Sequence, residues 1–377
     1  MNNNYEFWNE YLKNVIERIK QKLESKEELY VDLHMHSYYS ADSDVTLNQI
    51  IERSKEKKLD IISITDHDSV GIYDDLFEYL KTNNLDDLII IPGIEFTIDN
   101  KEYGSQFHIV QSMINPKDKD IIKDIKHQEE ANWNRAKIQL DRLHINKVAQ
   151  YYFKKYNFDC NYEGYKEFLK TFYKPIPEYL TIMKYIQNEF NKNEIYNWEI
   201  LERMQKENEK DKCLPRKKLR EKEFERLKTK YENDSESKYN SRMFHCMFAV
   251  RKSDDDYFEE YEPVGDLSVN NYGELKLDEL NKTNMTIFAH PTENKLNLLE
   301  GFIKLNNNIK GIEDNTRNEY KDYNTFIECK NKLGLIRTVG SDIHDLDSNL
   351  YDDMSLYKMN KKEILDYLEC ANNYIDN

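Results

Sequence analysis

Residues 32–36 read Asp32-Leu33-His34-Met35-His36, and far along the chain residues 340–344 read Gly340-Ser341-Asp342-Ile343-His344. In each stretch, two residue types that commonly bind metals stand two positions apart. Alternate side chains of a β-strand point to the same face, so each pair can reach a single ion. The two stretches therefore predict a strand-borne metal site that joins the two ends of the chain.

The histidines are unevenly distributed along the chain. Of nine in total, six lie at predicted strand ends: His34, His36, His67, His108, His290 and His344. The other three, His127, His144 and His245, fall in a polar middle region of helical periodicity. Histidines gathered at strand ends are hard to explain by core packing, and imidazole is the commonest metal ligand in proteins. This distribution predicts a multinuclear metal site.

Short apolar strands alternate with helices on both sides of that middle region. Strands are predicted at 29–33, 60–64, 88–91, 106–110, 286–289, 310–313 and 335–339, and helices at about 46–58, 73–83, 317–333 and 361–376. Thr46 and Gln49 form a capping-box pattern at one helix start. Continuously apolar strands between helices indicate a parallel sheet covered on both faces. Apart from those in 106–110, the suspected ligands follow strand C-terminal ends, where α/β barrels carry their active sites.

The chain divides into four predicted segments. Residues 1–28 place apolar side chains at helical spacing among charges, which favours an amphipathic helix packed on the body over a partner-binding helix. Residues 29–114 and 285–377 hold the two parts of the barrel, the second with a C-terminal helix. Residues 115–284 are rich in Lys, Glu, Asn and Tyr and helical in period, so they are predicted to be a mainly helical insertion.

Composition limits the classes of partner. The 377 residues carry a net charge of −16, which argues against simple whole-surface attraction to nucleic acid or to an anionic membrane. Five scattered cysteines without a Cys-x-x-Cys pair fit a reducing compartment. No signal peptide and no run of about 18 apolar residues is visible. A cytoplasmic protein that does not contact membranes is expected.

Six short motifs resemble those of the polymerase-and-histidinol-phosphatase (PHP) family of metallophosphoesterases. In the family's order they are Asp32–Ser37, Thr65–Asp68, Gly93–Thr97, Phe107–Ile109, Ala289–Pro291 and Gly340–His344. Each motif is weak alone, but six in one order are specific, and they cover about 29–112 and 285–345. The resemblance implies an α/β fold, a distorted (β/α)7 TIM-like barrel of the PHP type, with a trinuclear metal site at its mouth.

The resemblance assigns nine ligands to three divalent ions. The first ion would be held by His34, His36, Glu95 and Asp342, the second by Glu95, His108 and His290, and the third by Asp42, His67 and His344. In the loop 37–45 the alternative to Asp42 is Asp44, and the six-residue offset from His36 favours Asp42. Six imidazoles and three carboxylates suit Mn²⁺, Zn²⁺ or Fe²⁺, and the sequence does not choose among them.

The reaction implied by the resemblance is in-line hydrolysis of a phosphoester by a metal-bound hydroxide, with Glu95 bridging two ions. Asp66 is expected to orient an imidazole from behind. Asp68 is expected to do the same or to assist protonation of the leaving group, with an ordinary turn carboxylate as the alternative. Arg317 is expected to contact the substrate phosphate bidentately, with a surface ion pair as the alternative.

Three functions compete for this site. The first is a nuclease or oligonucleotide phosphodiesterase. In its favour, residues 134–143 resemble the Arg-bearing helix of the family's exonuclease-like branch, and residues 214–230 hold eight basic and three acidic residues. That basic run is also typical of a solvated helix with internal ion pairs. The aromatic residues at 151–156 are able to stack on bases, or to form the insertion's own core.

The second function is a small-molecule phosphomonoesterase of the histidinol-phosphatase type, whose substrate would be a phosphorylated small molecule. That branch usually has no insertion of this length. The third is a non-enzymatic scaffold, which the complete ligand set disfavours. Related PHP modules are joined to ATPase domains, so a separately encoded ATPase is a candidate partner.

Overall fold

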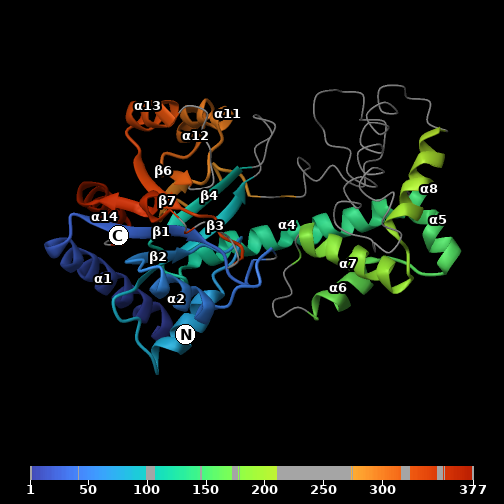
Figure 1. Cartoon of the computed structure of the whole chain (residues 1–377), viewed down its shortest axis with the longest axis horizontal. Coiled ribbons are helices and arrows are strands. Elements are labelled where there is room, and N and C mark those ends of the chain that lie inside the picture. Colours follow the sequence, from blue (N-terminus) through green and yellow to red (C-terminus); the bar gives the residue numbers. More distant parts are fainter. Residues whose placement is uncertain are drawn as a thin grey trace. The chain divides into compact units, whose positions relative to one another are not determined.

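The computed structural model of the chain describes residues 2–40, 42–98, 107–144, 147–171, 177, 179–209, 273, 275–315, 323–345, 351 and 353–375. Two compact units are present. The first combines Met1–Gln128 with Glu274–Asn377, and the second is Glu129–Gly273 (Figure 1). The predicted insertion, 115–284, therefore begins and ends within the first unit.

Eight strands of the first unit form one sheet in the order β7-β6-β5-β4-β3-β2-β1-β8. Their bounds are β1 (Glu28–Met35), β2 (Ile61–Ile64), β3 (Ile89–Ile98), β4 (Phe107–Ser112), β5 (Met285–Phe288), β6 (Ile309–Asn315), β7 (Ile336–Gly340) and β8 (Lys358–Asn360). The sequence predicted the first seven and missed β8, which has only three residues. The residues of β2 are all buried, as expected for a central strand covered on both faces.

The sheet curves until the segment after β7 meets the C-terminal end of β1. Beyond β7, the Asp342 N–H donates to the His34 carbonyl at 2.8 Å, and the His36 N–H donates to the Ile343 carbonyl at 2.9 Å. These bonds join the end of β1 to the segment after β7 and produce a nearly closed barrel. The predicted α/β barrel is thus confirmed.

The prediction of a parallel sheet is wrong for two strands. β4 pairs antiparallel with both β3 and β5, and β8 pairs antiparallel with β1. β4 follows β3 directly in the sheet, so the chain returns without a crossover. Because β4 runs the opposite way, its N-terminal end lies at the rim where β3 ends. This places His108, at the start of β4, beside Thr97 of β3.

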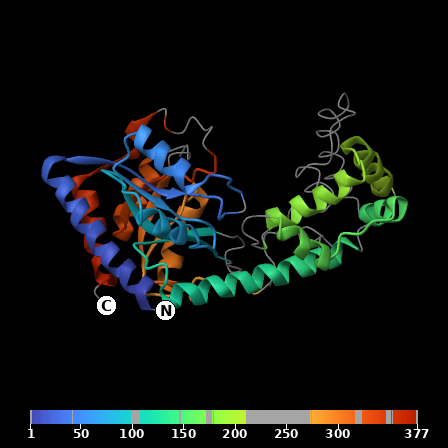
Figure 2. The same cartoon turned by 90° about the horizontal axis from the view of Figure 1, so that it is seen from below.

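The helices of the first unit are α1 (Asn2–Ser25), α2 (Leu47–Glu56), α3 (Ile72–Leu80), α11 (Glu293–Leu296), α12 (Leu299–Leu305), α13 (Tyr323–Leu333) and α14 (Lys361–Ile375), with a 3₁₀ turn, η4 (Met354–Tyr357). The predicted capping box is present at Thr46, whose side chain accepts from the Gln49 N–H. α1 and α14 lie side by side on the outside of the barrel (Figures 1 and 2).

α1 is held to the barrel by apolar packing and by one buried carboxylate. Trp8 and Ile19 of α1 are fully buried. Asp60, just before β2, accepts from Lys22 Nζ at 3.0 Å and from Lys26 Nζ at 2.7 Å. Both contacts fix the C-terminal end of α1 against the start of the barrel.

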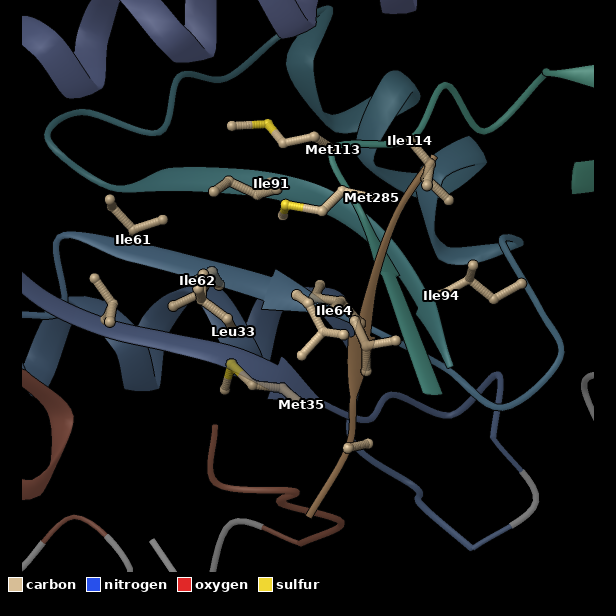
Figure 3. Packing of buried hydrophobic residues seen from close by; sticks show 14 of the residues in the cluster. Leu33, Met35, Ile61, Ile62, Ile64, Ile91, Ile94, Met113, Ile114 and Met285 are labelled. Carbon is tan, nitrogen blue, oxygen red and sulfur yellow. The ribbon is translucent and has the colours of Figure 1, made fainter. Parts of the chain in front are cut away.

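The apolar side chains of the first three strands pack into a continuous core. Figure 3 shows Leu33 and Met35 of β1, with Ile62 and Ile64 of β2, packed beneath Ile91 of β3. All are at most 5% exposed. Each such side chain contributes about 1.5–3 kcal/mol by leaving water. This core holds the strand ends in the positions from which the polar site is built.

The second unit is helical where the structure describes it. Its helices are the C-terminal part of α4 (Lys119–Leu143), α5 (Lys147–Tyr156), α6 (Tyr162–Leu169), α7 (Tyr179–Lys192) and α8 (Asn197–Glu209). Tyr152, Tyr165 and Phe190 belong to its apolar cluster, and Phe153 and Tyr156 pack against it partly buried, so most aromatic residues of 151–156 serve the core of this unit. Tyr151 is instead 38% exposed, and the Arg203 guanidinium lies 4.1 Å from its ring centroid.

The basic run 214–230 and Arg317 lie outside the described residues. Among the helices that the structure does describe, none is long and apolar enough to cross a membrane.

Candidate metal centre

The nine predicted ligands meet at one rim of the barrel. They come from β1 and the turn after it (His34, His36, Asp42), from the end of β2 (His67), from β3 and β4 (Glu95, His108), and from the segments after β5 and β7 (His290, Asp342, His344). Their ligand atoms form three overlapping groups, each with its atoms within 4.8 Å of one another: His36, Asp42, His67 and His344; His34, Glu95, His290 and Asp342; and His67, Glu95 and His108. These groups cut across the three predicted sets, since His36 groups with Asp42 and His290 groups with His34. Residues far apart in the sequence thus form one polar cluster.

The first predicted set surrounds the Nε2 atoms of His34 and His36, which are 3.1 Å apart. Glu95 Oε2 lies 3.2 Å from each of them. Asp342 Oδ1 is 3.6 Å from His34 Nε2 and 3.2 Å from His36 Nε2. Donors bound at 2.0–2.2 Å to one ion lie about 3.0 to 3.6 Å apart in octahedral or tetrahedral arrangements. These four side chains therefore have the spacing of donors that share an ion.

The second predicted set uses the other oxygen of Glu95. His108 Nδ1 lies 3.0 Å from Glu95 Oε1, His290 Nε2 lies 3.1 Å from it, and the two imidazole nitrogens are 3.2 Å apart. Glu95 is fully buried and presents its two oxygens to two different sets of imidazoles. This is the arrangement of a carboxylate that bridges two ions.

The third predicted set lies around Asp42, in a group that also contains His36. Its Oδ2 is 3.0 Å from His344 Nε2 and 3.7 Å from His67 Nε2. His67 also points its Nδ1 toward Glu95 Oε2 at 3.0 Å, so its ring stands between this set and the first. Asp44 is in none of the three groups, so among the described residues the geometry favours Asp42.

Three buried atoms of the cluster have no hydrogen-bond partner: Glu95 Oε2, His67 Nδ1 and His344 Nε2. A buried polar atom without a partner is costly, and it is rare in folded proteins. Each of these atoms is a lone-pair donor directed into the cluster. The residues therefore fit divalent cations, which would satisfy all three atoms at once.

A carboxylate behind the cluster orients His34. Glu313, at the end of β6, places its Oε2 2.6 Å from His34 Nδ1, on the side of the ring away from Glu95. From the sequence, only Arg317 was predicted to act beside this strand end, and Glu313 was missed. The sequence feature that could have identified Glu313 is its position as an acidic residue at the C-terminal end of an apolar strand.

His36 is oriented through a hydroxyl. Its Nδ1 lies 2.9 Å from Ser40 Oγ, and the Ser40 hydroxyl donates to Asp66 Oδ1 at 2.9 Å. Asp66 is fully buried and also accepts from the N–H and the hydroxyl of Ser37, both at 2.6 Å. Asp66 thus lies behind the ligands, as predicted, but it reaches His36 through Ser40 and makes no direct contact with His67 among the described hydrogen bonds.

The side chain of Asp68 accepts hydrogen bonds from β3 and α4. Its Oδ1 accepts from the Thr97 N–H at 3.4 Å and from Gln128 Nε2 at 3.3 Å. Its backbone is left-handed, with φ of 48°, and the same holds for His290 at 26° and Asp342 at 54°. Such conformations are uncommon for residues with a Cβ, and they cluster at functional sites.

The charges of the cluster shift one another's pKa values. Burial alone would raise the pKa of Glu95, but His34, His67 and His108 hold it well below its usual range. Burial would lower the pKa of His34, but Glu313 and Glu95 raise it. At Asp32, burial raises the pKa to about 6 despite hydrogen bonds from Ser341 and Tyr351. Opposed shifts of this kind are typical of functional sites.

Comparison with known proteins supports the same fold. Residues 32–214 match the family model described as PHP domain. An amidohydrolase from Chromobacterium violaceum is similar over 88% of this chain and 98% of its own, at 15% identity and a TM-score of 0.50. A candidate metal-dependent phosphoesterase from Bifidobacterium adolescentis is similar over 90% and 96%, at 14% identity and a TM-score of 0.52. Among curated protein sequences no significant match is found.

The predicted resemblance to the PHP family is confirmed by the match to residues 32–214. No comparison singles out an exonuclease-like branch. The match begins at Asp32 and stops before His290, Asp342 and His344. The structure adds these three side chains to the cluster. His290 is placed there by the pairing of β5 with β4, and Asp342 and His344 by the closure between β1 and the segment after β7.

Proposed function

We propose that this chain is a metal-dependent phosphoesterase that hydrolyses phosphodiester bonds of nucleic acid or oligonucleotides. The observation that carries the proposal is the position of Glu95, whose two oxygens each face a separate set of imidazoles at 3.0 to 3.2 Å. Divalent ions bound there would lower the pKa of water and offset charge on a phosphate. An imidazole-rich cluster that includes carboxylates suits that chemistry.

The side chains have separate tasks in this proposal. Glu95 keeps two cation sites adjacent and supplies negative charge to both. His34, His36 and Asp342 complete one site, and His108 and His290 complete the other. Asp42, His67 and His344 provide a third position at the edge of the cluster, where the side chain of Asp42 is 28% exposed and hence reachable by substrate.

The choice of a phosphodiester rests on the sequence. Residues 214–230 hold eight basic and three acidic residues in a chain of net charge −16. Such a local excess of positive charge is suited to a phosphate backbone, whose binding depends on Lys and Arg contacts. Arg317, the proposed phosphate contact, follows the end of β6, which is the strand that carries Glu313.

A gel assay tests the proposal. Single-stranded DNA and RNA, labelled at the 5′ or the 3′ end, are incubated with Mn²⁺ and either the wild type or Glu95→Gln. We expect cleavage by the wild type alone, with the label pattern reporting polarity and sugar preference. If the wild type leaves every oligonucleotide intact but hydrolyses small phosphate monoesters, the phosphodiester assignment is wrong and the phosphomonoesterase is correct.

Charge reversal of Arg216, Lys217 and Lys218 separates the two roles of the basic run. If the run contacts a polynucleotide, turnover of a long strand falls much more than turnover of an aryl phosphate, and the loss shrinks as salt is raised. Equal effects on both substrates would identify the run as a solvated helix.

A further inference from the structure

Glu313 is the buried carboxylate of the rim that the ligand assignment leaves unused. It is 2% exposed and lies on β6, whereas His34 lies on β1. Its Oε2 lies 2.6 Å from His34 Nδ1, and its Oε1 accepts from Asn315 Nδ2 at 2.9 Å. Because Oε2 is engaged by His34 Nδ1 and Oε1 by Asn315 Nδ2, Glu313 is not assigned as a ligand itself.

Gly340 makes the contact between β6 and β1 sterically possible. A Cβ at this position would lie 2.5 Å from the His34 Cβ and 3.0 Å from the Glu313 Cδ. Gly340 pairs with Asn315 of β6 at the end of β7, so it lies between the two side chains. Any larger residue there would force the carboxylate and the imidazole apart.

The imidazoles of the cluster differ in the group that contacts the ring nitrogen facing away from the cluster. His36 Nδ1 contacts a neutral hydroxyl, Ser40, and His344 Nδ1 contacts the backbone carbonyl of Asp342 at 2.8 Å. Whereas the Asp342 carboxylate lies 3.7 Å from His344 Nδ1, His34 is the one of these three rings with a carboxylate within hydrogen-bond distance of the nitrogen opposite the cluster. A carboxylate there fixes the Nδ1–H tautomer, leaves the Nε2 lone pair free for a cation, and raises the basicity of the ring.

We propose that Glu313 is a positioning residue that holds His34 as an Nε2 ligand and makes the position bounded by His34, His36, Glu95 and Asp342 the tightest cation site of the cluster. The inference rests on the proposed metal-dependent function. Removal of an outer carboxylate of this kind lowers metal affinity about 10- to 100-fold. In Glu313→Gln the amide oxygen can still accept from His34 Nδ1, so shape is kept while charge is lost.

Titration of metal-free protein with Co²⁺, followed by visible absorption and by the number of ions retained after gel filtration, tests the role without an activity assay. We expect Glu313→Gln to weaken the tightest Co²⁺ by about 10- to 100-fold, and Gly340→Ala to act in the same direction. Glu300→Gln, an exposed glutamate of α12, is the matched control. Asp314→Asn removes the neighbouring carboxylate of β6, which pairs with Arg337, and should lower stability without weakening Co²⁺.

A Co²⁺ titration of Glu313→Gln that superimposes on the wild type would overturn the role of Glu313 alone. If the wild type binds no Co²⁺, the proposed metal-dependent function is wrong, and the proposed role of Glu313 is wrong with it. Because a variant can fail to fold, the protonation of His34 is also read by ¹⁵N-histidine NMR in wild type loaded with diamagnetic Zn²⁺. A protonated Nδ1 and an unprotonated Nε2 at His34 are expected in that state, and an Nε2 that keeps its proton would refute the proposal.

Discussion

Replacement of Glu95 by Gln should abolish turnover and remove bound metal. Oε2 of this side chain lies 3.0 to 3.2 Å from nitrogens of His34, His36 and His67, and Oε1 lies 3.0 and 3.1 Å from those of His108 and His290. An amide keeps one oxygen, so it can serve one ion at most, and the NH₂ group that replaces the other oxygen turns donor hydrogens toward the second. The substitution also removes the charge that offsets two neighbouring cations.

The size of the effect follows from the cation that the variant can no longer hold. A cation that stabilises a transferring phosphoryl group contributes several kcal/mol to the transition state. With a loss of about 4 kcal/mol, turnover falls about 10³-fold, because each 1.4 kcal/mol is a factor of ten. Metal content should fall by at least one ion per chain, since one of the two sets of imidazoles then lacks an anionic partner.

Inductively coupled plasma mass spectrometry of dialysed protein and steady-state turnover of an aryl phosphate diester measure the two effects together. Glu300→Gln, which removes an exposed carboxylate, should change neither. Glu95→Gln protein that keeps the wild-type ion content and turnover within about threefold would refute the bridging role. A variant that loses turnover but keeps every ion would show that Glu95 acts on substrate and not on metal.

Three further perturbations test the fold and the site. Removal of metal by a chelator should lower the unfolding temperature, and Mn²⁺ should restore it, because cation binding favours the folded state. Asp60→Asn should cost about 1–2 kcal/mol near pH 7. Burial alone would raise the pKa of Asp60, but its two lysine partners and a backbone N–H lower it below 3.8. The ionised carboxylate therefore stabilises the folded state above that pH. The difference in stability between Asp60→Asn and the wild type should vanish as the pH falls through the pKa of Asp60 in the folded state. Arg337→Met leaves the carboxylates of two partly buried partners unpaired, at 2.8 and 3.3 Å in the wild type, and should cost about 3 kcal/mol in denaturant unfolding.

Most of the barrel was predictable because its strands are continuously apolar and its ligands stand at fixed positions beside them. Most predicted ligands follow the C-terminal end of a strand, but His108 lies within the predicted strand 106–110. The structure gives the physical reason for this exception. An antiparallel β4 presents its first residues at the rim where its parallel neighbours end. Strand direction is not encoded in the local pattern of β4, so the mixed sheet could not be read from it.

The groups behind the ligands could not be predicted, since they depend on contacts between distant strands. Glu313 reaches His34 only because β6, β7 and β1 come together and because Gly340 leaves space between them. A glutamate at a strand end is common, and local sequence does not show which imidazole it will meet. Asp66 could be named because it adjoins His67, but its actual connection to His36 runs through Ser40.

Barrel closure and the proposed cation site depend on the same few residues. The two hydrogen bonds that join β1 to the segment after β7 involve the backbones of His34, His36, Asp342 and Ile343, and the side chains of the first three belong to one predicted set of ligands. Mutual repulsion among buried imidazoles opposes closure, whereas a cation shared across this junction favours it. The carboxylates of Glu95 and Glu313, on either side of His34, reduce that repulsion in the metal-free protein. The same carboxylates that suit the rim to a cation therefore also lower the electrostatic cost of closing the barrel.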